Sequence, residues 1–229
     1  MRNDVPLPQG AEKVAAVDSM FDTIAPRYDL LNRMLTFGMD VGWRNKTVAS
    51  LGLAPGSVVL DLACGTGDLC RVLAAGGLRP VGVDRSAGML AAARTDAALV
   101  RGDGLHLPVP DGSVDGVTCG FALRNVLDLG AFFTECARVL RPGGRVALLE
   151  VCEPANPVLR AGHSVYFNKV VPLVGGLVSD RAAYRYLPKS LAYLPPGPEI
   201  LALLDEGFVD TRRRMLSVGI AQLLTGTRR

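Results

Sequence analysis

The sequence predicts an α/β fold in which helices cover both faces of a mostly parallel sheet. From Ser57 onward, short apolar runs alternate with helix-like segments, which is the order typical of a parallel sheet. The chain has 229 residues, of which 49% are hydrophobic and 21% are charged, so it is long and apolar enough for one large domain with its own core. No internal repeat and no linker indicates a second domain.

Each apolar run that is bounded by turn residues is predicted as a strand. The runs cover residues 57–62, 80–84, 98–101, 114–120 and 145–150, followed by two final strands near 208–216 and 217–224. Helices are predicted between these strands, and the residues before the first strand are predicted as two or three short helices. The later helices are expected at 68–75, from Ser86 to about Arg94, around the apolar positions Phe132, Phe133, Cys136 and Val139, and near 199–206.

Charge and cysteine usage exclude several classes of protein. The 25 basic and 22 acidic residues give a net charge of +3, which provides no strong field for nucleic acid. The five cysteines stand mostly inside apolar elements and are expected to be buried thiols in a reducing compartment. The N-terminus has no apolar run of the signal-peptide kind, and no stretch reaches about 18 uncharged apolar residues. A cytoplasmic location is therefore expected.

Three acidic residues, Asp61, Asp84 and Asp103, stand at the ends of the first three predicted strands. Ligands of open parallel sheets bind at this edge. Asp84 is positioned to accept hydrogen bonds from both ribose hydroxyls of an adenosine. Asp103 and Gly104, after the third strand, are positioned to recognise the adenine amine.

The turn after the first strand reads DLACGTGD at 61–68. Gly65 and Gly67 allow positive φ angles and a close approach of the backbone to a ligand. The start of the following helix, with Thr66 beside it, offers free N–H groups to a carboxylate. The alternative is a tight strand-to-helix turn without a ligand.

Two cofactors fit an adenosine site of this kind. A dinucleotide site would show G-x-G-x-x-G, but Cys70 stands where the third glycine belongs. An acid before the turn, Asp61, suits the ammonium group of S-adenosylmethionine, whose carboxylate and adenosine match the other positions. S-adenosylmethionine is therefore the expected cofactor, and NAD is the alternative. Arg85 is expected in the same site, and no metal site is predicted.

These cofactor motifs, together with RVLRPGG at 138–144, resemble class I S-adenosylmethionine-dependent methyltransferases. The flanking segments are similar to the menaquinone and ubiquinone C-methyltransferase family from about residue 17 to the end. The segments that carry this likeness are MFDTIAPRYDLLN at 20–32, Phe37-Gly38, Trp43-Arg44, FALRNV at 121–126, Leu149-Glu150 with Pro154, and YRYL at 184–187 after Asp180.

The resemblance implies a Rossmann-like fold with seven strands, of which the last is antiparallel. It also implies a small-molecule lipid acceptor: C-methylation of demethylmenaquinol to menaquinol, or of a methoxy-benzoquinol precursor of ubiquinone. Three positions depart from the family: Asp40-Val41 replaces a His-Arg pair, Leu223-Leu224 a Leu-His pair, and His163 a tyrosine. None of them lies in a cofactor motif, so the departures leave the expected cofactor unchanged and concern only which ring the enzyme methylates.

The predicted elements divide the domain into four segments. Residues 1–50 form a helical cap, 57–150 the cofactor-binding core, 151–196 an insertion on the substrate side, and 197–229 the closing helix and strands. The insertion is too long for a simple connection and is rich in aromatic residues, so a lid or pocket role is expected.

Arg124 and Asn125 follow the fourth strand and are the candidate catalytic residues. Arg124 stays protonated and is expected to stabilise charge on the quinol oxygen, while Asn125 orients that oxygen. The alternative for Arg124 is a surface arginine at a helix start. Tyr28, His163 and Tyr184 are candidate substrate-binding residues, with ordinary packed tyrosines and a satisfied or solvated histidine as the alternatives. His163 is the one neutral-range base near the insertion, and water is the alternative general base.

The run VVPLVGGLV at 170–178 has no charge and is predicted either to line a groove for an isoprenoid tail or to belong to the core. A peripheral contact at the inner face of the membrane would follow from such a substrate. Two other functions stay open. An RNA methyltransferase would need a basic face, for which Arg212-Arg213-Arg214 is the one cluster, and a non-catalytic binding module would keep the same cofactor motifs.

Overall fold

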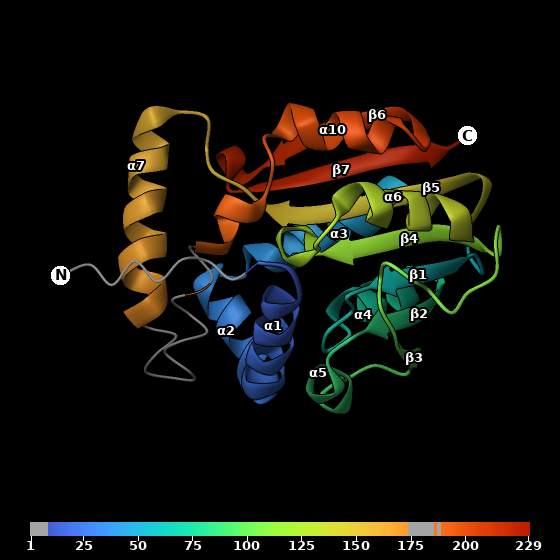
Figure 1. Cartoon of the computed structure of the whole chain (residues 1–229), viewed down its shortest axis with the longest axis horizontal. Coiled ribbons are helices and arrows are strands. Elements are labelled where there is room, and N and C mark those ends of the chain that lie inside the picture. Colours follow the sequence, from blue (N-terminus) through green and yellow to red (C-terminus); the bar gives the residue numbers. More distant parts are fainter. Residues whose placement is uncertain (1–8, 174–185, 187–188) are drawn as a thin grey trace.

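The centre of the protein is a seven-stranded sheet with the order β3-β2-β1-β4-β5-β7-β6 (Figure 1). The computed structural model describes residues 9–173, 186 and 189–229. Strands β1 to β5 run parallel to one another, and β7 is antiparallel to both β5 and β6. The expected fold is confirmed. The strands are β1 (Val58–Leu62), β2 (Arg79–Asp84), β3 (Ala98–Arg101), β4 (Val114–Gly120), β5 (Leu140–Val151), β6 (Phe208–Leu216) and β7 (Ala221–Arg228).

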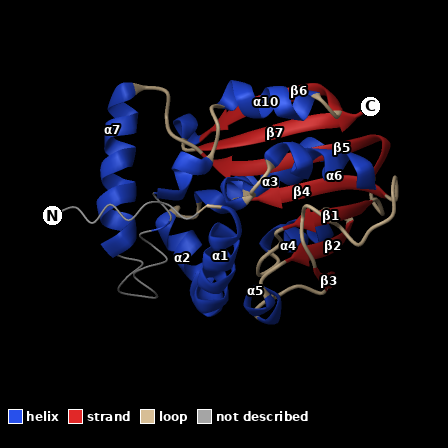
Figure 2. Ribbon diagram, in the orientation of Figure 1, coloured by secondary structure: helices blue, strands red, loops and turns tan. Residues whose placement is uncertain are grey.

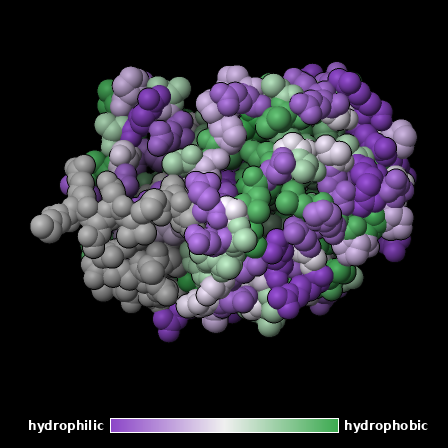
Figure 3. All heavy atoms as spheres, in the orientation of Figure 1, coloured by the Kyte–Doolittle hydropathy of each residue, from purple (hydrophilic) through white to green (hydrophobic). Residues whose placement is uncertain are grey.

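Helices cover both faces of the sheet (Figure 2). Successive residues of β5 point to opposite faces, which separates the core into two layers. Val146 and Leu148 pack with the first layer, which includes α6 (Leu129–Val139) and α10 (Gly197–Asp205). Ala147 and Leu149 pack with the second layer, which includes α3 (Met39–Leu51) and α4 (Asp68–Ala75). On the face shown in Figure 3, hydrophobic side chains gather near the centre and hydrophilic ones cover the end of the sheet away from α7.

The N-terminal helices lie at the carboxyl ends of the parallel strands (Figure 1). They are α1 (Gly10–Ile24), the 3₁₀ turn η1 (Ala25–Arg27) and α2 (Tyr28–Leu35). A separate apolar cluster of Ile24, Ala25 and Leu31 with Met89 and Val171 joins these helices to α5 (Ala87–Ala91) and to the insertion. The expected cap is therefore formed by α1 and α2, whereas α3 packs on the sheet.

The insertion begins with α7 (Pro157–Val165), which stands away from the sheet in Figure 1. Asn156 caps it by accepting from the N–H groups of Val158 and Leu159, and Pro157 occupies the first helical turn. A π-helical turn, Tyr166–Val170, continues the helix. Turns of this kind are frequent at functional sites.

Three boundaries differ from the sequence predictions. The last strand covers Ala221–Arg228 and not 217–224, because 217–219 form a 3₁₀ turn in which Ser217 and Val218 have positive φ. β5 begins at Leu140, which already pairs with Val114 before the irregular Pro142–Gly144 turn. α5 ends at Ala91, because the Arg94 N–H donates to the Thr66 carbonyl and leaves the helical path.

Candidate active site

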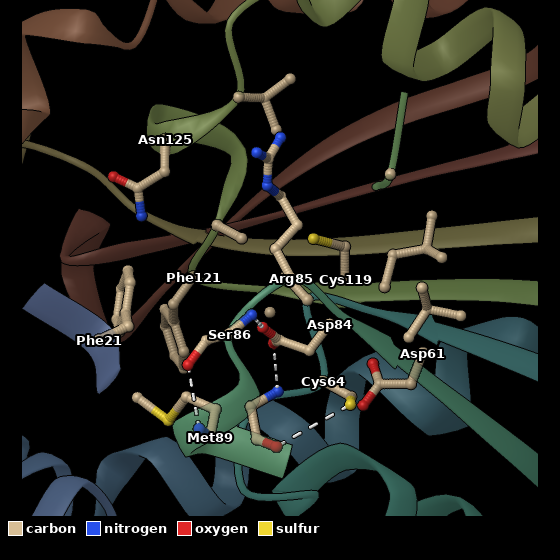
Figure 4. Close-up of a pocket in the computed structure, with 18 of the residues that line it drawn as sticks. Phe21, Asp61, Cys64, Asp84, Arg85, Ser86, Met89, Cys119, Phe121 and Asn125 are labelled. Carbon is tan, nitrogen blue, oxygen red and sulfur yellow. Dashed lines mark hydrogen bonds between the residues drawn. The ribbon is translucent and has the colours of Figure 1, made fainter. Parts of the chain in front are cut away.

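A cavity of 210 Å³ lies at the carboxyl ends of β1, β2 and β4. Such an edge is where open α/β sheets bind ligands. Its walls contain every predicted cofactor residue except Gly67. The residues are Asp61, Gly65, Thr66, Asp84, Arg85, Asp103 and Gly104, joined by Asn125 and by cap residues such as Phe21 (Figure 4).

The turn between β1 and α4 has the backbone that the motif predicts. Gly65 and Gly67 have φ angles of 54° and 84°. A Cβ on Gly67 would lie 2.6 Å from the Thr95 side chain, whereas one on Gly65 would meet nothing nearer than the Met89 sulfur at 3.9 Å. Gly67 therefore gives close packing, and Gly65 presents open backbone to the cavity. Ala63 also has a positive φ, 52°, which the sequence did not indicate.

Asp84 joins two loops of the cavity through its carboxylate. Oδ2 accepts from the Gly65 N–H at 2.7 Å and Oδ1 from the Ser86 N–H at 2.8 Å (Figure 4). Burial raises the pKa of Asp84, while these two N–H groups act in the opposite direction. The carboxylate is therefore held in place before any ligand binds.

Asp61 lies at the inner end of the same cavity and is almost fully buried, at 1% exposure. The Thr118 hydroxyl donates to Oδ1 at 2.8 Å, and the Cys70 thiol lies 3.4 Å from Oδ2. Burial raises the pKa of Asp61 to about 7, although both hydrogen bonds lower it. This carboxyl group changes its charge near neutral pH.

The third acidic position is more exposed. Asp103 forms an ion pair with Arg85 at 2.8 Å, and Arg85 also reaches Asp18 of α1 at 3.4 Å. Gly104 lies against the Phe132 ring, since a Cβ there would be 3.1 Å from it. The region therefore presents a carboxylate and a guanidinium from adjoining loops.

The cap is attached to the cavity loops by polar side chains that sequence reasoning missed. Lys13 is buried and donates to the carbonyl oxygens of Arg124, at 3.0 Å, and Val126, at 3.2 Å. Asp22 accepts from the Ser86 hydroxyl at 2.5 Å and from the Gly88 N–H at 2.9 Å. Asp29 accepts from the Thr66 hydroxyl. No local motif signals these contacts, because each partner lies far along the chain.

A second cavity of 400 Å³ adjoins the first. Its walls come from α2, α3, the turn after β4, α7 and the turn before β7, and most of its side chains are apolar. Tyr28 and Phe121 line both cavities and so lie at their junction. Burial raises the pKa of Tyr28, which keeps its hydroxyl protonated.

Phe121 is a site residue whose role the sequence did not reveal. It follows β4 with a φ of 61°, a conformation uncommon for a bulky residue. Its ring packs edge-on against Trp43 at 6.2 Å and lies 5.3 Å from the Arg44 guanidinium carbon. Backbone strain of this kind concentrates at ligand sites.

Arg124 and Asn125, in the 3₁₀ turn η2 (Leu123–Asn125), line different cavities. Arg124 lines the second cavity, with Nη1 2.5 Å from Glu150 Oε1 and Nε donating to the Ser190 hydroxyl at 3.1 Å. It is only 4% exposed, so the surface interpretation is wrong. Asn125 lines the cofactor cavity, and its Oδ1 accepts from the Tyr186 hydroxyl at 3.0 Å.

His163 of α7 lines the second cavity, as Tyr28 does. Its ring stacks on Phe167 with centroids 4.4 Å apart. At 9% exposure it is buried, so the solvated alternative is wrong. The predictions for Tyr184 and for residues 174–178 of the apolar run lie outside the described residues. Residues 170–173 are described, and of these Val171 lines the second cavity.

The sheet order and the cofactor edge define the class: a Rossmann-like, class I methyltransferase fold. Solved structures share it. A SAM-dependent methyltransferase of Thermotoga maritima has a TM-score of 0.64 at 17% identity, covering 92% of this chain and 99% of that one. Phosphoethanolamine N-methyltransferase 2 of Haemonchus contortus, with bound S-adenosyl-L-methionine, has a TM-score of 0.59 at 16% identity, covering 80% of this chain and 52% of that one.

The chain belongs to the ubiE/COQ5 methyltransferase family, whose model matches residues 9–228. A demethylmenaquinone methyltransferase of Roseiflexus castenholzii is 43% identical over 97% of this chain and 98% of its own. A ubiquinone/menaquinone biosynthesis C-methyltransferase of Syntrophotalea carbinolica is 42% identical over 91% of this chain and 92% of its own. The expected family, the methyltransferase class and S-adenosylmethionine as cofactor are confirmed.

Proposed function

We propose that this enzyme methylates a ring carbon of a quinol, and that its acceptor is a demethylmenaquinol. The observation that carries the proposal is the pair of adjoining cavities, one that contains the acidic residues at the strand ends and one largely apolar beneath the cap and α7. Methyl transfer requires a donor and an acceptor carbon aligned through one opening. Tyr28 and Phe121 line both cavities and are the residues proposed to flank that opening. The names of the relatives support a quinol as the acceptor.

The side chains of the first cavity fit the parts of S-adenosylmethionine. The cofactor supplies an electrophilic methyl group on a sulfonium. Gly65 presents backbone that no Cβ obstructs, and the buried Asp61 suits an ammonium group. The proposed contacts are Asp84 with the ribose hydroxyls, Gly65, Thr66 and Gly67 with the carboxylate, Asp61 with the ammonium, and Arg85, Asp103 and Gly104 with the adenine side.

Arg124 is proposed to stabilise the negative charge that develops on a ring oxygen. Its guanidinium stays protonated, and the ion pair with Glu150 holds it in position at the second cavity. The Tyr186 hydroxyl holds Asn125 Oδ1, so the amide nitrogen of Asn125 is the group proposed to donate to that oxygen from the cofactor side, where the acceptor ring reaches the junction of the two cavities. Closure of the cap over both cavities excludes water from the reaction.

The second cavity is proposed to hold the ring and the first part of an isoprenoid tail. Phe37, Val158 and Val218 line it and are 78%, 80% and 71% exposed, so its rim presents apolar side chains to the surroundings. None of the described helices is long and apolar enough to cross a bilayer. A peripheral contact of this rim with the inner face of the membrane is therefore proposed. Co-sedimentation with phospholipid vesicles tests it, and Phe37→Ser with Val158→Ser should lower the bound fraction.

Labelled S-adenosylmethionine separates the candidate functions. The purified chain is incubated with a demethylmenaquinol, a methoxy-benzoquinol, RNA or no acceptor. Label transfer to demethylmenaquinol alone supports the proposal. Transfer to RNA, or cofactor binding without transfer to any acceptor, would refute it. RNA is the less favoured acceptor because the basic cluster that would bind it, Arg212–Arg214, lies on β6 at the edge of the sheet and lines neither cavity.

A series of demethylmenaquinols with zero, one, two and four isoprene units tests the tail site, assayed below the micelle concentration of the detergent. Each methylene that becomes buried adds up to about 0.8 kcal/mol, so affinity should rise over the first units and then level off. Leu159→Ser with Val171→Ser should flatten the rise without changing cofactor affinity, because both residues line only the second cavity. A flat series in the native chain would mean that only the ring is recognised.

A further inference from the structure

We infer that His163 is the general base of the reaction and accepts the proton of the ring hydroxyl through Nε2. This inference rests on the proposed quinol acceptor and names the group that activates it. The supporting observation is an unpartnered polar atom: His163 Nε2 is buried and has no hydrogen-bond partner. Buried polar atoms without partners are uncommon, and each one calls for an explanation such as a ligand or a catalytic role.

The position of His163 indicates what that ligand is. His163, from α7, lines the second cavity together with Arg124 and Phe121, from the segment that follows β4. Stacking on Phe167 fixes its plane, and the Tyr166 hydroxyl ties the same helix to the Leu35 carbonyl of α2 at 2.8 Å. A ring bound in this cavity therefore shares it with a fixed cation and a fixed imidazole.

The other titratable groups of the cavity are unsuited to the role. Asp40 is engaged by Arg44 and by the Thr36 hydroxyl, and Arg124 is engaged by Glu150. Burial raises the pKa values of Tyr28 and Tyr166, so both stay protonated near neutral pH. Among the described residues that line the cavity, His163 is the one whose ordinary pKa lies near 7.

Burial lowers the pKa of His163 from 6.5, and exposed Glu153, just before α7, raises it in part. The imidazole is therefore neutral at pH 7, which is the form a base requires. Arg124 and Asp40 are the other charged groups that face the cavity, and each has an opposite charge beside it.

His163 Nε2 takes the hydroxyl proton, and the O–H electron pair moves into the ring. The activated ring carbon forms the new bond to the methyl group, and the C–S bond breaks with its electrons on sulfur. The ring carbon then loses its hydrogen as a proton, which restores the aromatic ring, and the imidazolium returns its proton to the ring oxygen. One proton is released in each turnover.

The decisive variant is His163→Gln, which keeps a polar side chain of similar length but cannot act as a base. With S-adenosylmethionine kept at saturation, so that Asp61 does not contribute, the native kcat/KM for the quinol should rise with pH and level off above the pKa of His163. In His163→Gln we expect a fall of about 100-fold or more at pH 7, in the range typical of a lost general base. The rising limb should move toward the pKa of the quinol hydroxyl, which is about 10 for a phenol. Cofactor affinity should stay within about twofold.

Two matched variants complete the experiment. His106→Gln removes the other histidine of the chain, which is exposed, and should leave the profile unchanged. Glu153→Gln should move the native limb to lower pH by a few tenths of a pH unit, because it removes the charge that raises the pKa of His163. That shift identifies the titrating group even if His163→Gln folds poorly.

An NMR measurement separates the inference from the proposed function, since it requires no turnover. The two histidines give two sets of imidazole signals, assigned with His106→Gln. Addition of 1,4-naphthalenediol to the complex with S-adenosylhomocysteine should shift the His163 signals and leave those of His106 in place. Unmoved His163 signals, or a His163→Gln enzyme that methylates quinol with the native profile, would overturn the inference and leave the proposed function intact. A native chain that methylates no quinol would overturn both.

Discussion

The two cavities are built in different ways. The cofactor cavity takes most of its polar groups from the ends of consecutive strands, within the segment from Asp61 to Gly104 and the turn after β4. The helices α1, α2 and α3 add Asp18, Tyr28 and Arg44. The acceptor cavity collects its walls from five places along the chain, from Tyr28 to Ile220. A parallel sheet brings strand ends together through its topology alone, whereas the acceptor cavity exists only after the cap and α7 have docked.

Their polar groups also differ in how they are satisfied. Asp84 and Asp61 each accept hydrogen bonds from the protein, so the cofactor cavity is organised without a ligand. In the acceptor cavity, Arg124 has protein partners but His163 Nε2 has none. The cofactor side is thus preorganised, and the acceptor side keeps one group for the substrate.

The largest expected effect tests the ion pair with Glu150 that holds Arg124 at the acceptor cavity. Arg124→Met leaves Glu150, which is 0% exposed, as a buried charge without its partner. Breaking a buried pair in this way costs about 3–5 kcal/mol, so the free energy of unfolding in urea should fall by that amount. The double variant Arg124→Met with Glu150→Leu should recover much of the loss. Equal stability of the native chain and Arg124→Met would mean that the pair contributes little.

Arg124→Lys then separates stability from catalysis at the same position. Lysine keeps the charge but loses the planar fork that contacts Glu150 and Ser190 together. We expect a large fall in kcat with little change in cofactor affinity, because Arg124 does not line the cofactor cavity. Turnover within about twofold of the native value would make Arg124 a purely structural residue.

Asp84→Ala should affect the cofactor cavity and not the acceptor cavity. It removes the proposed acceptor for two ribose hydroxyls and frees the N–H groups of Gly65 and Ser86. A hydrogen bond to a charged group contributes about 1.5–3 kcal/mol, so cofactor affinity should fall tenfold or more in calorimetry. Asp103→Ala, at a more exposed ion pair, should have a smaller effect. Unchanged affinity in a folded Asp84→Ala protein would remove the central cofactor assignment.

Cofactor binding should also depend on pH through Asp61. Its pKa of about 7 means that the free carboxyl group is largely neutral below pH 7, whereas an ammonium ligand binds the charged form. Affinity should therefore fall as pH decreases below about 7, by at most tenfold per pH unit, until the pKa of the bound form is passed. Asp61→Asn should bind weakly and without this dependence. A native affinity that is constant between pH 5.5 and 8 would place the ammonium elsewhere.

The same pKa makes a prediction about the free protein. A carboxyl group whose folded pKa lies above its unfolded value of 3.8 stabilises the fold most at low pH and loses that contribution as pH rises through about 7. Asp61→Asn should therefore be at least as stable as the native chain at pH 8 in the absence of cofactor. Thermal unfolding of both proteins at pH 6 and pH 8 checks the sign of the change in their stability difference.

The sequence predicted correctly those features that depend on residues close together in the chain. Alternating runs predicted the sheet, and the acids that end strands, Asp61 and Asp84, lie in one cavity as expected. Ser86 caps α5 through the Met89 N–H, also as predicted. The polar cap contacts and the role of Phe121 had no local signal, because each depends on a partner from a distant segment.

The predicted start of the last strand was wrong for a related reason. The turn at 217–219 stands between the apolar residues Leu216 and Ile220 and is predicted as strand, but the Trp43 indole donates to the Ser217 hydroxyl at 2.8 Å and the backbone turns there instead. Trp43 lies 174 positions earlier in the chain. A tertiary contact of that range overrides local propensity and is invisible to pattern reasoning.

The smallest expected effect concerns the attachment of the cap to the cofactor loops. Asp22→Asn keeps the shape of the side chain but weakens its hydrogen bonds to Ser86 and Gly88, which lower the pKa of Asp22. Because Asp22 is exposed, solvent offsets most of the loss, and we expect cofactor affinity to fall by no more than about threefold. Gly88→Ala is the matched steric test, since its Cβ would lie 2.9 Å from the Asp22 Cα, which is backbone and cannot simply rotate away. It should push α1 from the loop and weaken cofactor binding more than Asp22→Asn does, while the acceptor affinity, measured with the cofactor at saturation, should change less. If Gly88→Ala binds cofactor as the native chain does, α1 does not close the cofactor cavity, and the two cavities form independently of the cap.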